Sequence, residues 1–402
     1  MEEWKEYKLG EISTFSQGIQ VDIDKQYSDY KPGRVRFIRI VDFTRNDEPI
    51  RFIDKPRDKC LTEDGDIVMI RYGSQTAGLV AISYDGAIAN NIFKITFNNA
   101  VVSNEFGYYY LSQKSIFDFL RGAQSSSTMP AITFEIASRV PLFLPPIKEQ
   151  ERITKILKSL DDKIEVNRRI NENLEQQAQA LFKSWFVDFE PFKDQPFVES
   201  ELGMIPQGWK VGTFLDNINV MPGGTPSTGV EEYWKDGDIP FFSPKDVNGV
   251  YCFETEKRIT EKGLKNCSSH LYPKDTLFIT ARGTVGKLAL AGVPMAMNQS
   301  NYALVAKEGI GKYYLYLLAQ TMVAVLLKKA NGAVFSAITT KDFNEPTLVL
   351  SQSVLERFEK IITPLFDKIY ETSKESRRLA DLRDTLLPKL MSGEININEV
   401  CL

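Results

Sequence analysis

The chain has 402 residues, enough for two or three domains, and its 43% hydrophobic and 25% charged residues are typical of a folded globular protein. A formal net charge of −4 and a single histidine, His270, exclude a general polyanion binder and chemistry based on several imidazoles. The cysteines Cys60, Cys252, Cys267 and Cys401 form no Cys-x-x-Cys pair, the N-terminus is polar, and no run of 18 apolar residues occurs, so we expect reduced thiols, no zinc site, no membrane span and a cytoplasmic location.

An internal repeat divides the sequence into two halves. Three segments recur at an offset of 205 or 206 residues: Trp4-Lys5 and Trp209-Lys210, Ala131-Ile132-Thr133 and Ala337-Ile338-Thr339, and Leu160-Asp161-Asp162-Lys163-Ile164 and Leu365-Phe366-Asp367-Lys368-Ile369. A period this long is not that of a solenoid, whose repeats have about 20–50 residues. The repeat predicts a duplicated plan with pseudo-two-fold symmetry, in which a globular domain rich in strands precedes a long helix.

Each half ends in apolar residues spaced alternately by three and four positions, the heptad pattern of a coiled coil. The first seam consists of Ile153, Leu157, Leu160, Ile164, Asn167, Asn171, Leu174, Ala178, Leu181 and Trp185. The second consists of Phe358, Ile362, Leu365, Ile369, Thr372, Ser376, Leu379, Arg383, Leu386 and Leu390. Each run has 33 residues, which as a helix is about 50 Å long. A lone helix would expose this stripe to water, so we expect the two helices to pair.

Both seams become polar at their centres, with Asn167 and Asn171 in the first and Thr372 and Ser376 in the second. In an antiparallel pair these centres face each other, and polar seam positions fix the register at a cost in stability. The alternative is that each helix packs only against its own globular domain. The matched register of the two runs favours the helix pair.

Prolines mark the expected boundaries, because proline stops strands and helix interiors. Pro388 is expected to kink or end the second helix near Leu387. The predicted segments are a first globular domain (1–146), a long helix (147–188), a linker (189–208), a second globular domain (209–351), a second long helix (352–391) and a C-terminal tail (392–402).

Short apolar runs within the domains predict strands. The expected strands lie at 66–70, 92–97 and 276–279, and one helix is expected in each domain, at 108–120 and 313–329. The predicted fold class is therefore α+β, with two repeated α/β domains and two long helices forming an antiparallel coiled coil.

Motifs that carry catalysis are missing from the sequence. The stretch Arg282–Lys287 lacks the first glycine of a phosphate-binding loop, and no GxGxxG after a strand and no GxSxG occurs. We therefore predict a binding protein without a catalytic or metal site and without a cofactor of its own. An enzyme whose site is assembled from carboxylates distant in sequence is the alternative, and turnover by the isolated chain would indicate it.

The second domain carries loops suited to nucleic acid. The backbone N–H groups around Gly223 and Gly224 are expected to be free for phosphates, and arginine on the glycine-flexible turn after the strand at 276–279 can bind guanine through two hydrogen bonds. The residues predicted to contact DNA in this domain are Gly223, Gly224, Thr225, Lys245, Arg282, Gly283, Thr284, Lys287, Asn298 and Gln299.

Weaker counterparts occur in the first domain, with Asn90-Asn91 placed opposite Asn298-Gln299. The predicted contacts there are Arg71, Tyr72, Ser74, Gln75, Asn90 and Asn91. Each loop alone is more typical of an ordinary solvated turn. Their presence in matching positions of both halves favours two similar but non-identical readers, which suggests recognition of two short sequences at a fixed separation.

At this point the chain resembles the DNA-sequence specificity subunit of type I restriction–modification systems. The resemblance covers nearly the whole chain and is carried by segments in a characteristic order: Pro145-Pro146-Ile147-Lys148-Glu149-Gln150, Leu181 to Phe189, Glu201 to Trp209, Gly224-Thr225-Pro226, Tyr233-Trp234, Gly237 to Phe241, Arg282-Gly283-Thr284-Val285-Gly286, Asn298-Gln299 and Leu386 to Glu394. The first domain lacks the Gly-Gly-Thr-Pro and Arg-Gly-Thr strings, and the second long helix lacks a proline pair at its start.

The resemblance implies that each domain is a target recognition domain that reads one half of a bipartite, asymmetric site in double-stranded DNA. The paired helices would act as a ruler and dock two methyltransferase subunits, which would methylate adenine in DNA. Two restriction and translocase subunits would complete the assembly in a prokaryotic cell. It also implies that S-adenosylmethionine, ATP and Mg bind to those partners and not to this chain. A protein-binding scaffold or antirestriction mimic is the alternative, which the acidic balance suits and the Arg282 turn argues against.

Overall fold

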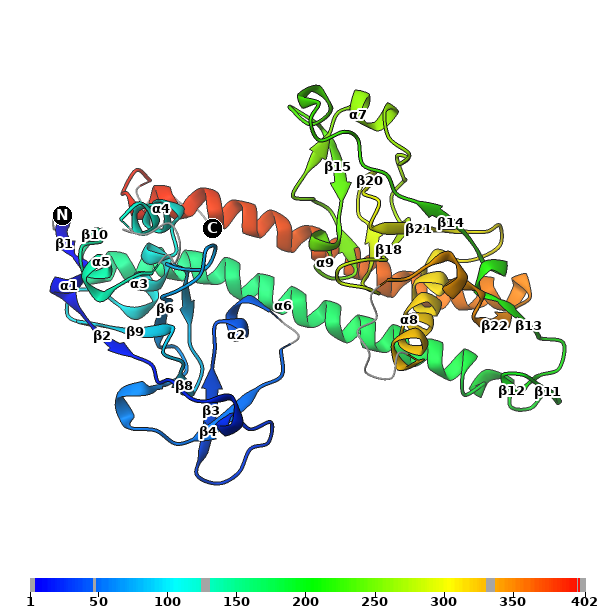
Figure 1. Ribbon diagram of the computed structural model, residues 1–402, viewed down its shortest axis with the longest axis horizontal. Helices are drawn as coiled ribbons and strands as arrows, with labels where there is room; N and C mark the ends of the chain where they lie inside the picture. Colours follow the sequence, from blue (N-terminus) through cyan, green and yellow to red (C-terminus); the bar gives the residue numbers. More distant parts are fainter. Residues whose placement is uncertain (1–3, 46–47, 124–130, 330–336, 396, 398–402) are drawn as a thin grey trace. The chain divides into compact units, whose positions relative to one another are not determined.

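The computed structural model describes residues 4–45, 48–123, 131–329, 337–395 and 397. The chain divides into two compact units, residues 1–163 with 379–402 and residues 164–378. The first unit contains the first domain and the second unit the linker and the second domain, and each unit includes part of both long helices (Figure 1).

The first unit contains two four-stranded sheets, with strand orders β2-β9-β6-β7 and β4-β3-β8-β5, and a separate pair β1-β10. Its strands are β1 (Lys5–Lys8), β2 (Ser13–Gln17), β3 (Arg34–Ile38), β4 (Arg51–Asp54), β5 (Leu61–Thr62), β6 (Ile67–Ile70), β7 (Val80–Ile82), β8 (Gly86–Ile88), β9 (Ile92–Phe97) and β10 (Pro141–Leu144). Its short helices are α1 (Leu9–Ile12), α2 (Val41–Thr44), α3 (Asn104–Leu111), α4 (Lys114–Gly122) and α5 (Phe134–Ser138), with the 3-10 turns η1 (Ile23–Lys25) and η2 (Asp58–Cys60).

The core of the first unit forms where the sheet β2-β9-β6-β7 meets α3, α4 and the start of the first long helix. Phe93 and Phe106 are fully buried there, and Leu157 of the long helix joins the same cluster. Each such side chain contributes about 1.5–3 kcal/mol by leaving water. The alternation in β9, where buried and more exposed residues take turns over Phe93–Phe97, is the period of a strand with one covered face.

The second unit repeats this plan with a five-stranded sheet β14-β21-β18-β19-β16, a three-stranded sheet β17-β15-β20 and the pairs β13-β22 and β11-β12. Its strands are β11 (Phe197–Ser200), β12 (Gly203–Pro206), β13 (Lys210–Thr213), β14 (Ile218–Pro222), β15 (Ile239–Phe242), β16 (Tyr251–Cys252), β17 (Arg258–Ile259), β18 (Leu277–Thr280), β19 (Leu288–Ala291), β20 (Ala296–Met297), β21 (Asn301–Ala306) and β22 (Pro346–Val349). Its helices are α7 (Glu261–Lys265) and α8 (Lys312–Lys329), with the 3-10 turns η3 (Glu190–Phe192), η4 (Phe214–Asp216), η5 (Glu231–Tyr233), η6 (Pro244–Asp246) and η7 (Thr340–Asn344).

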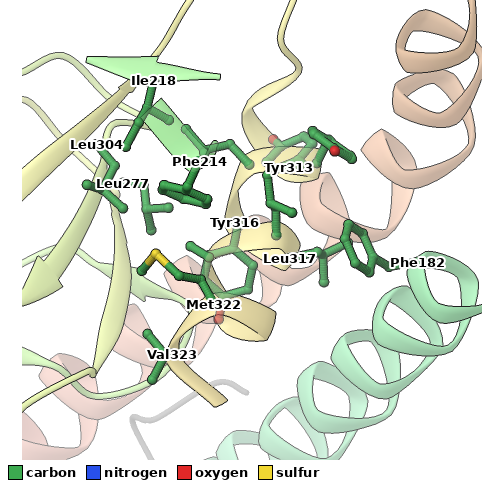
Figure 2. Packing of buried hydrophobic residues seen from close by; sticks show 14 of the residues in the cluster. Phe182, Phe214, Ile218, Leu277, Leu304, Tyr313, Tyr316, Leu317, Met322 and Val323 are labelled. Carbon is green, nitrogen blue, oxygen red and sulfur yellow. The ribbon is translucent and has the colours of Figure 1, made fainter. Parts of the chain in front are cut away.

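Helix α8 is covered on both sides in the second unit. Figure 2 shows Met322 of α8 on the side of the sheet residues Leu277 and Leu304, and Leu317 beside Phe182 of the first long helix. All these side chains belong to one buried cluster. A helix that is apolar around most of its circumference requires such a position between two layers.

Two long helices, α6 (Ile147–Phe186) and α9 (Gln352–Met391), have 40 residues each and confirm the prediction from the heptad pattern. The predicted bounds 352–391 agree with α9, which continues through Pro388 to Met391, so of the kink or end expected near Leu387 the end does not occur. Pro388 lies in the last turn, where it removes one hydrogen bond of the helix, and the following residues Leu390 and Met391 are buried in the first unit.

The two helices pair in opposite directions inside the second unit. The amide Nδ2 of Asn167 on α6 donates to Glu375 Oε2 on α9 at 2.8 Å and to the Thr372 carbonyl oxygen at 3.4 Å. Four residues further along α6, Asn171 Nδ2 donates to Ser373 Oγ at 3.0 Å and Asn171 Oδ1 accepts the Thr372 hydroxyl. The partners on α9 therefore run backward as the residues on α6 run forward.

Inside the first unit the helices are joined by Arg383 of α9, whose guanidinium donates to Asp161 of α6 at 2.6 Å. Asp161 also accepts the hydroxyl of Tyr109 from α3 at 2.6 Å. Throughout the two helices, the predicted seam residues are buried or half-buried: Leu160, Ile164, Asn167, Asn171, Leu174, Leu181, Leu365, Ile369, Thr372, Ser376, Leu379 and Leu386. Ser376 differs from its expected pairing, since its hydroxyl donates to the Thr372 carbonyl of its own helix.

Each long helix also supplies a side chain that accepts N–H groups at the N-terminus of a helix in its neighbouring domain. The fully buried Gln150 of α6 accepts the N–H of Ser103, the residue that caps α3. Glu359 of α9 accepts the N–H groups of Tyr313 and Tyr314 in α8, each at 3.2 Å. Burial raises the pKa of the Glu359 carboxyl above its ordinary value.

Three local predictions need correction. Two helices, α3 and α4, replace the single helix expected at 108–120, because the chain breaks at Ser112-Gln113. The linker at 189–208 contains a hairpin formed by β11 and β12, which the prolines had hidden. The strand after Gly65 begins at Ile67 and the one after Asp275 at Leu277, each one residue later than predicted.

The predicted fold class is confirmed: two repeated domains of mixed helix and sheet, accompanied by two long paired helices. No helix among the described residues is long and apolar enough to span a membrane.

Candidate nucleic-acid interface

In the second domain, the predicted DNA-contacting residues gather around one segment, Met297–Asn301, which joins β20 to β21. Gly223 and Gly224, at the end of β14, donate their N–H groups to the carbonyl oxygens of Asn301 and Met297, at 3.2 and 3.1 Å. Asn298 N–H donates to the carbonyl oxygen of Phe242, the last residue of β15. The ends of separate strands therefore meet at one edge of the domain.

The turn after β18 reaches the same segment. The N–H groups of Ala281 and Arg282 both donate to the Ser300 carbonyl oxygen, at 2.8 and 3.2 Å. Arg282 also forms an isolated antiparallel bridge with Ala337. Four stretches of chain are thereby held together: 223–225, 243–246, 281–287 and 297–301.

The glycines at the end of β14 do not offer free N–H groups, contrary to the prediction, because both donate within the domain. A side chain at Gly223 would overlap the Asn298 carbonyl, and one at Gly224 would overlap Ser268. The two glycines are therefore explained by close backbone approach. Thr225, the next residue, instead places its hydroxyl against the exposed Gln299, to whose Oε1 it donates.

The turn that carries Arg282 has a fixed geometry rather than the flexible one predicted. The buried Thr280 accepts the Lys287 N–H at 2.9 Å through its hydroxyl oxygen, and its hydroxyl donates to the Thr284 carbonyl. Its backbone exchanges further bonds with Lys287 and Gly286. Gly283 and Gly286 have φ values of 81° and 85°, which glycine adopts without strain.

This geometry leaves the side chains of Arg282, Thr284 and Lys287 exposed. Among the described residues, the guanidinium of Arg282 and the ammonium of Lys287 form no hydrogen bond or ion pair. A guanidinium held on a rigid turn with its donors unused is ready to bind a base edge or a phosphate.

The remaining predicted residues of the second domain serve different purposes. Asn298 Oδ1 accepts the Ser300 N–H at 3.0 Å and the Asn301 Nδ2–H at 2.7 Å, so this amide oxygen shapes the segment. Gln299 is exposed. Lys245 lies at the same edge, in η6, with a side chain that is 78% exposed and 3.5 Å from Glu256.

The first domain builds the same edge with the same backbone hydrogen bonds. Gly18 N–H donates to the Ile92 carbonyl oxygen at 3.2 Å and Ile19 N–H to that of Ile88 at 2.9 Å. These bonds match those of the two glycines after β14. A side chain at Gly18 would overlap Ala89, just as one at Gly223 would overlap Asn298. Sequence inspection missed Gly18 because only one glycine of the pair is present.

The second equivalence lies at the end of the parallel strands β3 and β8. Ala89 N–H donates to the Ile38 carbonyl oxygen at 2.9 Å, and Arg39 N–H donates to the Asp42 carboxylate at 2.8 Å. In the second domain Asn298 N–H donates to Phe242, and Ser243 N–H donates to the Asp246 carboxylate at 2.7 Å. Arg39 therefore corresponds to Ser243, two positions before Lys245.

The third equivalence concerns the turn after β6. Tyr72 forms an isolated antiparallel bridge with Ala131, as Arg282 does with Ala337. The Ile132 N–H donates to the Arg71 carbonyl oxygen at 2.9 Å, so Arg71 stands at the position of Ala281. The residue that corresponds to Arg282 is therefore Tyr72.

The matching backbone hydrogen bonds of the two domains shift the predicted correspondence of Asn90-Asn91 by one residue. Since Ala89 corresponds to Asn298, Asn90 corresponds to Gln299 and Asn91 to Ser300. The predicted pairing of Asn90-Asn91 with Asn298-Gln299 is corrected accordingly. Asn90 and Asn91 are half-buried, and the Asn91 Oδ1 is buried without a hydrogen-bond partner among the described residues.

The other predicted residues of the first domain lie on the turn after β6. Ser74 and Gln75 are exposed, and the Ser74 carbonyl accepts the Arg121 guanidinium from α4 at 2.9 Å. Arg71 and Tyr72 are half-buried, and the guanidinium of Arg71 lies 5.1 Å from the centre of the Tyr72 ring. The first domain therefore offers a neutral aromatic group where the second offers a guanidinium.

No group of three or more His, Cys, Asp or Glu side chains that could hold a metal ion occurs among the described residues. The edge in the second domain offers exposed amide, hydroxyl and cationic groups, and the edge in the first offers the exposed side chains of Ser74 and Gln75 beside the half-buried Tyr72; such groups are suited to binding DNA.

Comparison with known proteins identifies the family. A family model described as the type I restriction modification DNA specificity domain matches residues 1–176 and 206–352. The chain belongs to this family. Specificity subunits recognise DNA and are not catalytic by themselves, in agreement with the missing catalytic motifs.

Relatives of this specificity subunit extend over most of the chain. The MjaIX specificity subunit of Methanocaldococcus jannaschii is 30% identical over 330 residues, covering 80% of this chain and 76% of the relative. The HindI specificity subunit of Haemophilus influenzae is 27% identical and covers 98% of this chain and 100% of the relative. The crystal structure of an S subunit of a type I restriction–modification system from M. genitalium matches with a TM-score of 0.55 at 16% identity, over 96% of both chains. This last likeness supports the fold alone.

Proposed function

We propose that the second domain reads one half-site of a bipartite, asymmetric DNA sequence through the edge around Met297–Asn301, and that the first domain reads the other half-site through the edge around Ile88–Ile92. One observation carries this proposal. The two domains build the same edge with matching backbone hydrogen bonds but present different side chains there. A shared frame with different reading groups is what two different half-sites require.

We propose that partners supply much of the phosphate contact, a division of labour that the formal net charge of −4 supports. We propose that two methyltransferase subunits dock on the paired helices and that two restriction and translocase subunits complete the assembly. S-adenosylmethionine would bind to the methyltransferase subunits, and ATP and Mg to the restriction and translocase subunits. The chain would then supply the sequence preference and the spacing, and its partners the chemistry.

Arg282 gives the sharpest test of the site in the second domain. If its guanidinium binds guanine through two hydrogen bonds, Arg282→Ala weakens binding by about 1–3 kcal/mol and relaxes one position of one half-site. If it binds only phosphate, affinity falls for all sequences and the salt slope decreases by about one. The measurement is DNA binding by the complex with the methyltransferase subunit, at several salt concentrations and with each base of the site varied.

Lys265→Ala is a matched control, because Lys265 is an exposed cation in α7 that pairs with Glu261 on the same helix. If Arg282→Ala behaves like this control in affinity, salt slope and base preference, the edge around Met297–Asn301 is not the DNA-binding site.

A further inference from the structure

In the first domain, Tyr72 occupies the position of Arg282, and its ring contacts the guanidinium of Arg71. Among the described residues, the Tyr72 hydroxyl forms no hydrogen bond and its ring takes part in no aromatic pair. The core of the first unit does not include it. Among the described residues the Tyr72 oxygen is not one of the buried polar atoms that lack a partner, so the hydroxyl is open to solvent and is available to a ligand as donor and acceptor.

The backbone holds Tyr72 in the same orientation as Arg282. Both residues follow the central strand of their sheet by two positions, and both bridge the alanine of an Ala-Ile-Thr segment. Side chains alternate between the faces of an extended strand. Tyr72 and Arg282, which share a register, therefore leave the backbone on the same side.

The neighbouring Arg71 contacts the ring of Tyr72 and does not occupy the position that corresponds to Arg282. Arg71 corresponds to the buried Ala281, and its guanidinium lies over the Tyr72 ring at 5.1 Å from the centre. Its Nε is buried without a hydrogen-bond partner among the described residues. A cation at this distance from an aromatic face is attracted to it, which orients the phenol.

The turn beyond Tyr72 is anchored in its own way. The Thr76 hydroxyl donates to the Tyr72 carbonyl at 3.0 Å, and Arg121 donates to the Ser74 carbonyl at 2.9 Å. Gly73 has a φ of 124°, where a side chain would also overlap the Thr76 hydroxyl. The phenol is thus presented by a turn fixed at both ends, as the guanidinium is in the second domain.

From these observations we propose that Tyr72 is a specificity-determining residue of the first domain and that its hydroxyl contacts a base edge in the first half-site. The proposal rests on the function proposed above and assigns its reading group in the first domain. A phenol hydroxyl both donates and accepts a hydrogen bond, whereas a guanidinium only donates. The two half-sites are therefore read by groups of different chemistry, with Arg71 acting as a positioning residue.

The test uses the full chain together with its methyltransferase subunit and maps methylated adenines in a genome. Tyr72→Phe keeps the ring and removes the hydroxyl, and Tyr72→Ala removes both. Tyr30→Ala is the matched control, because Tyr30 is a 67% exposed tyrosine that precedes the opposite end of β3 in the same domain. Arg282→Ala reports on the second domain in parallel.

We expect Tyr72→Phe and Tyr72→Ala to relax the same base position of the first half-site and to leave the second half-site unchanged. In binding assays the preference for the wild-type base at that position should fall roughly 5- to 150-fold, the factor that corresponds to about 1–3 kcal/mol. Tyr30→Ala should leave the recognised sequence and the affinity as in the wild type.

The outcomes separate this proposal from the one on which it rests. If Tyr72→Phe keeps the wild-type pattern while Arg282→Ala alters the second half-site, the Tyr72 contact is refuted and the proposed function stands. A second result also refutes the Tyr72 contact. If Tyr72→Phe behaves as wild type and Tyr72→Ala either changes both half-sites or lowers the melting temperature, the side chain of Tyr72 has a structural role only. If neither the Arg282 nor the Tyr72 variants alter any half-site, the proposed edges themselves are refuted.

Discussion

The hydroxyl of Thr280 fixes the turn that carries Arg282, so its removal links local stability to DNA reading. Thr280→Val keeps the size of the side chain and deletes the bond to the Thr284 carbonyl and the 2.9 Å bond from the Lys287 N–H. Each hydrogen bond contributes a net 0.5–1.5 kcal/mol, so the free energy of unfolding of the turn should fall by about 1–3 kcal/mol.

The effect on DNA binding has an upper limit. A loosened turn loses only the advantage of holding Arg282, Thr284 and Lys287 in place, so Thr280→Val cannot weaken binding to the second half-site by more than the combined removal of these three side chains does. In the double variant with Arg282→Ala the two effects should add only in part, because both weaken the contact made by the same guanidinium.

Amide hydrogen exchange measures the loss of stability of the turn, and DNA binding by the complex with the methyltransferase subunit measures the loss of affinity for the second half-site. The Lys287 amide should exchange faster in Thr280→Val and at the wild-type rate in Thr280→Ser, which keeps the hydroxyl. Unchanged exchange in Thr280→Val would refute the role assigned to the hydroxyl. Additive losses in the double variant would show that Thr280 does not act through Arg282.

Three further predictions address the helices. Glu359→Ala should lower the free energy of unfolding by about 1–3 kcal/mol because two N–H groups of α8 lose their acceptor, whereas Glu359→Gln should keep one of the two bonds, because the two N–H groups bond to different oxygens of Glu359 and a glutamine amide has a single acceptor oxygen. Burial raises the Glu359 pKa above 4.5, so the free energy of unfolding of the wild type should fall as the pH rises through the raised pKa, and that of Glu359→Gln should not. Denaturation curves at several pH values measure the stability of both variants and the wild type. The same pH dependence in Glu359→Gln and the wild type would contradict the role given to the Glu359 carboxyl. Asn167→Leu should raise the stability by about 1 kcal/mol, because it removes a fully buried amide whose Oδ1 has no partner among the described residues; a loss in thermal unfolding would show that its hydrogen bonds outweigh this cost. Inserting seven residues after Asn171 and seven after Ser376 should widen the gap between methylated half-sites by about three base pairs, since one heptad adds about 10.5 Å. An unchanged gap with full methylation would show that the helices do not set the spacing.

The long helices could be predicted from the sequence because their three-and-four spacing is a local signal that repeats over many turns. The end of the helix expected near Leu387 does not occur, because the effect of Pro388 depends on its surroundings. The one hydrogen bond that Pro388 cannot form in the last turn is outweighed by the burial of Leu390 and Met391. A second proline inside α9, Pro364, is flanked by the fully buried Ile362 and Phe366. Whether a helix passes through a proline therefore depends on tertiary packing, which periodicity does not report.

The candidate site was predictable only in part. Arg282 stood out because a cation followed by glycine after an apolar run is a local pattern. The status of the glycine N–H groups was not predictable, since their acceptors lie more than 70 residues away in sequence. The correspondence of Tyr72 with Arg282 was hidden because the offset between the domains changes from 205 at Gly18 and Gly223 to 210 here, as loops of different length intervene.

If each domain reads one half-site independently, a domain exchange should change one half-site alone. Residues 209–351 are replaced by the corresponding residues of a relative that recognises a different sequence, and the methylated adenines are mapped with the same methyltransferase subunit. We expect one half-site to take the relative's sequence while the other half-site and the gap remain those of the wild type. A change in both half-sites, or in neither while methylation persists, would show that the two domains do not read DNA independently.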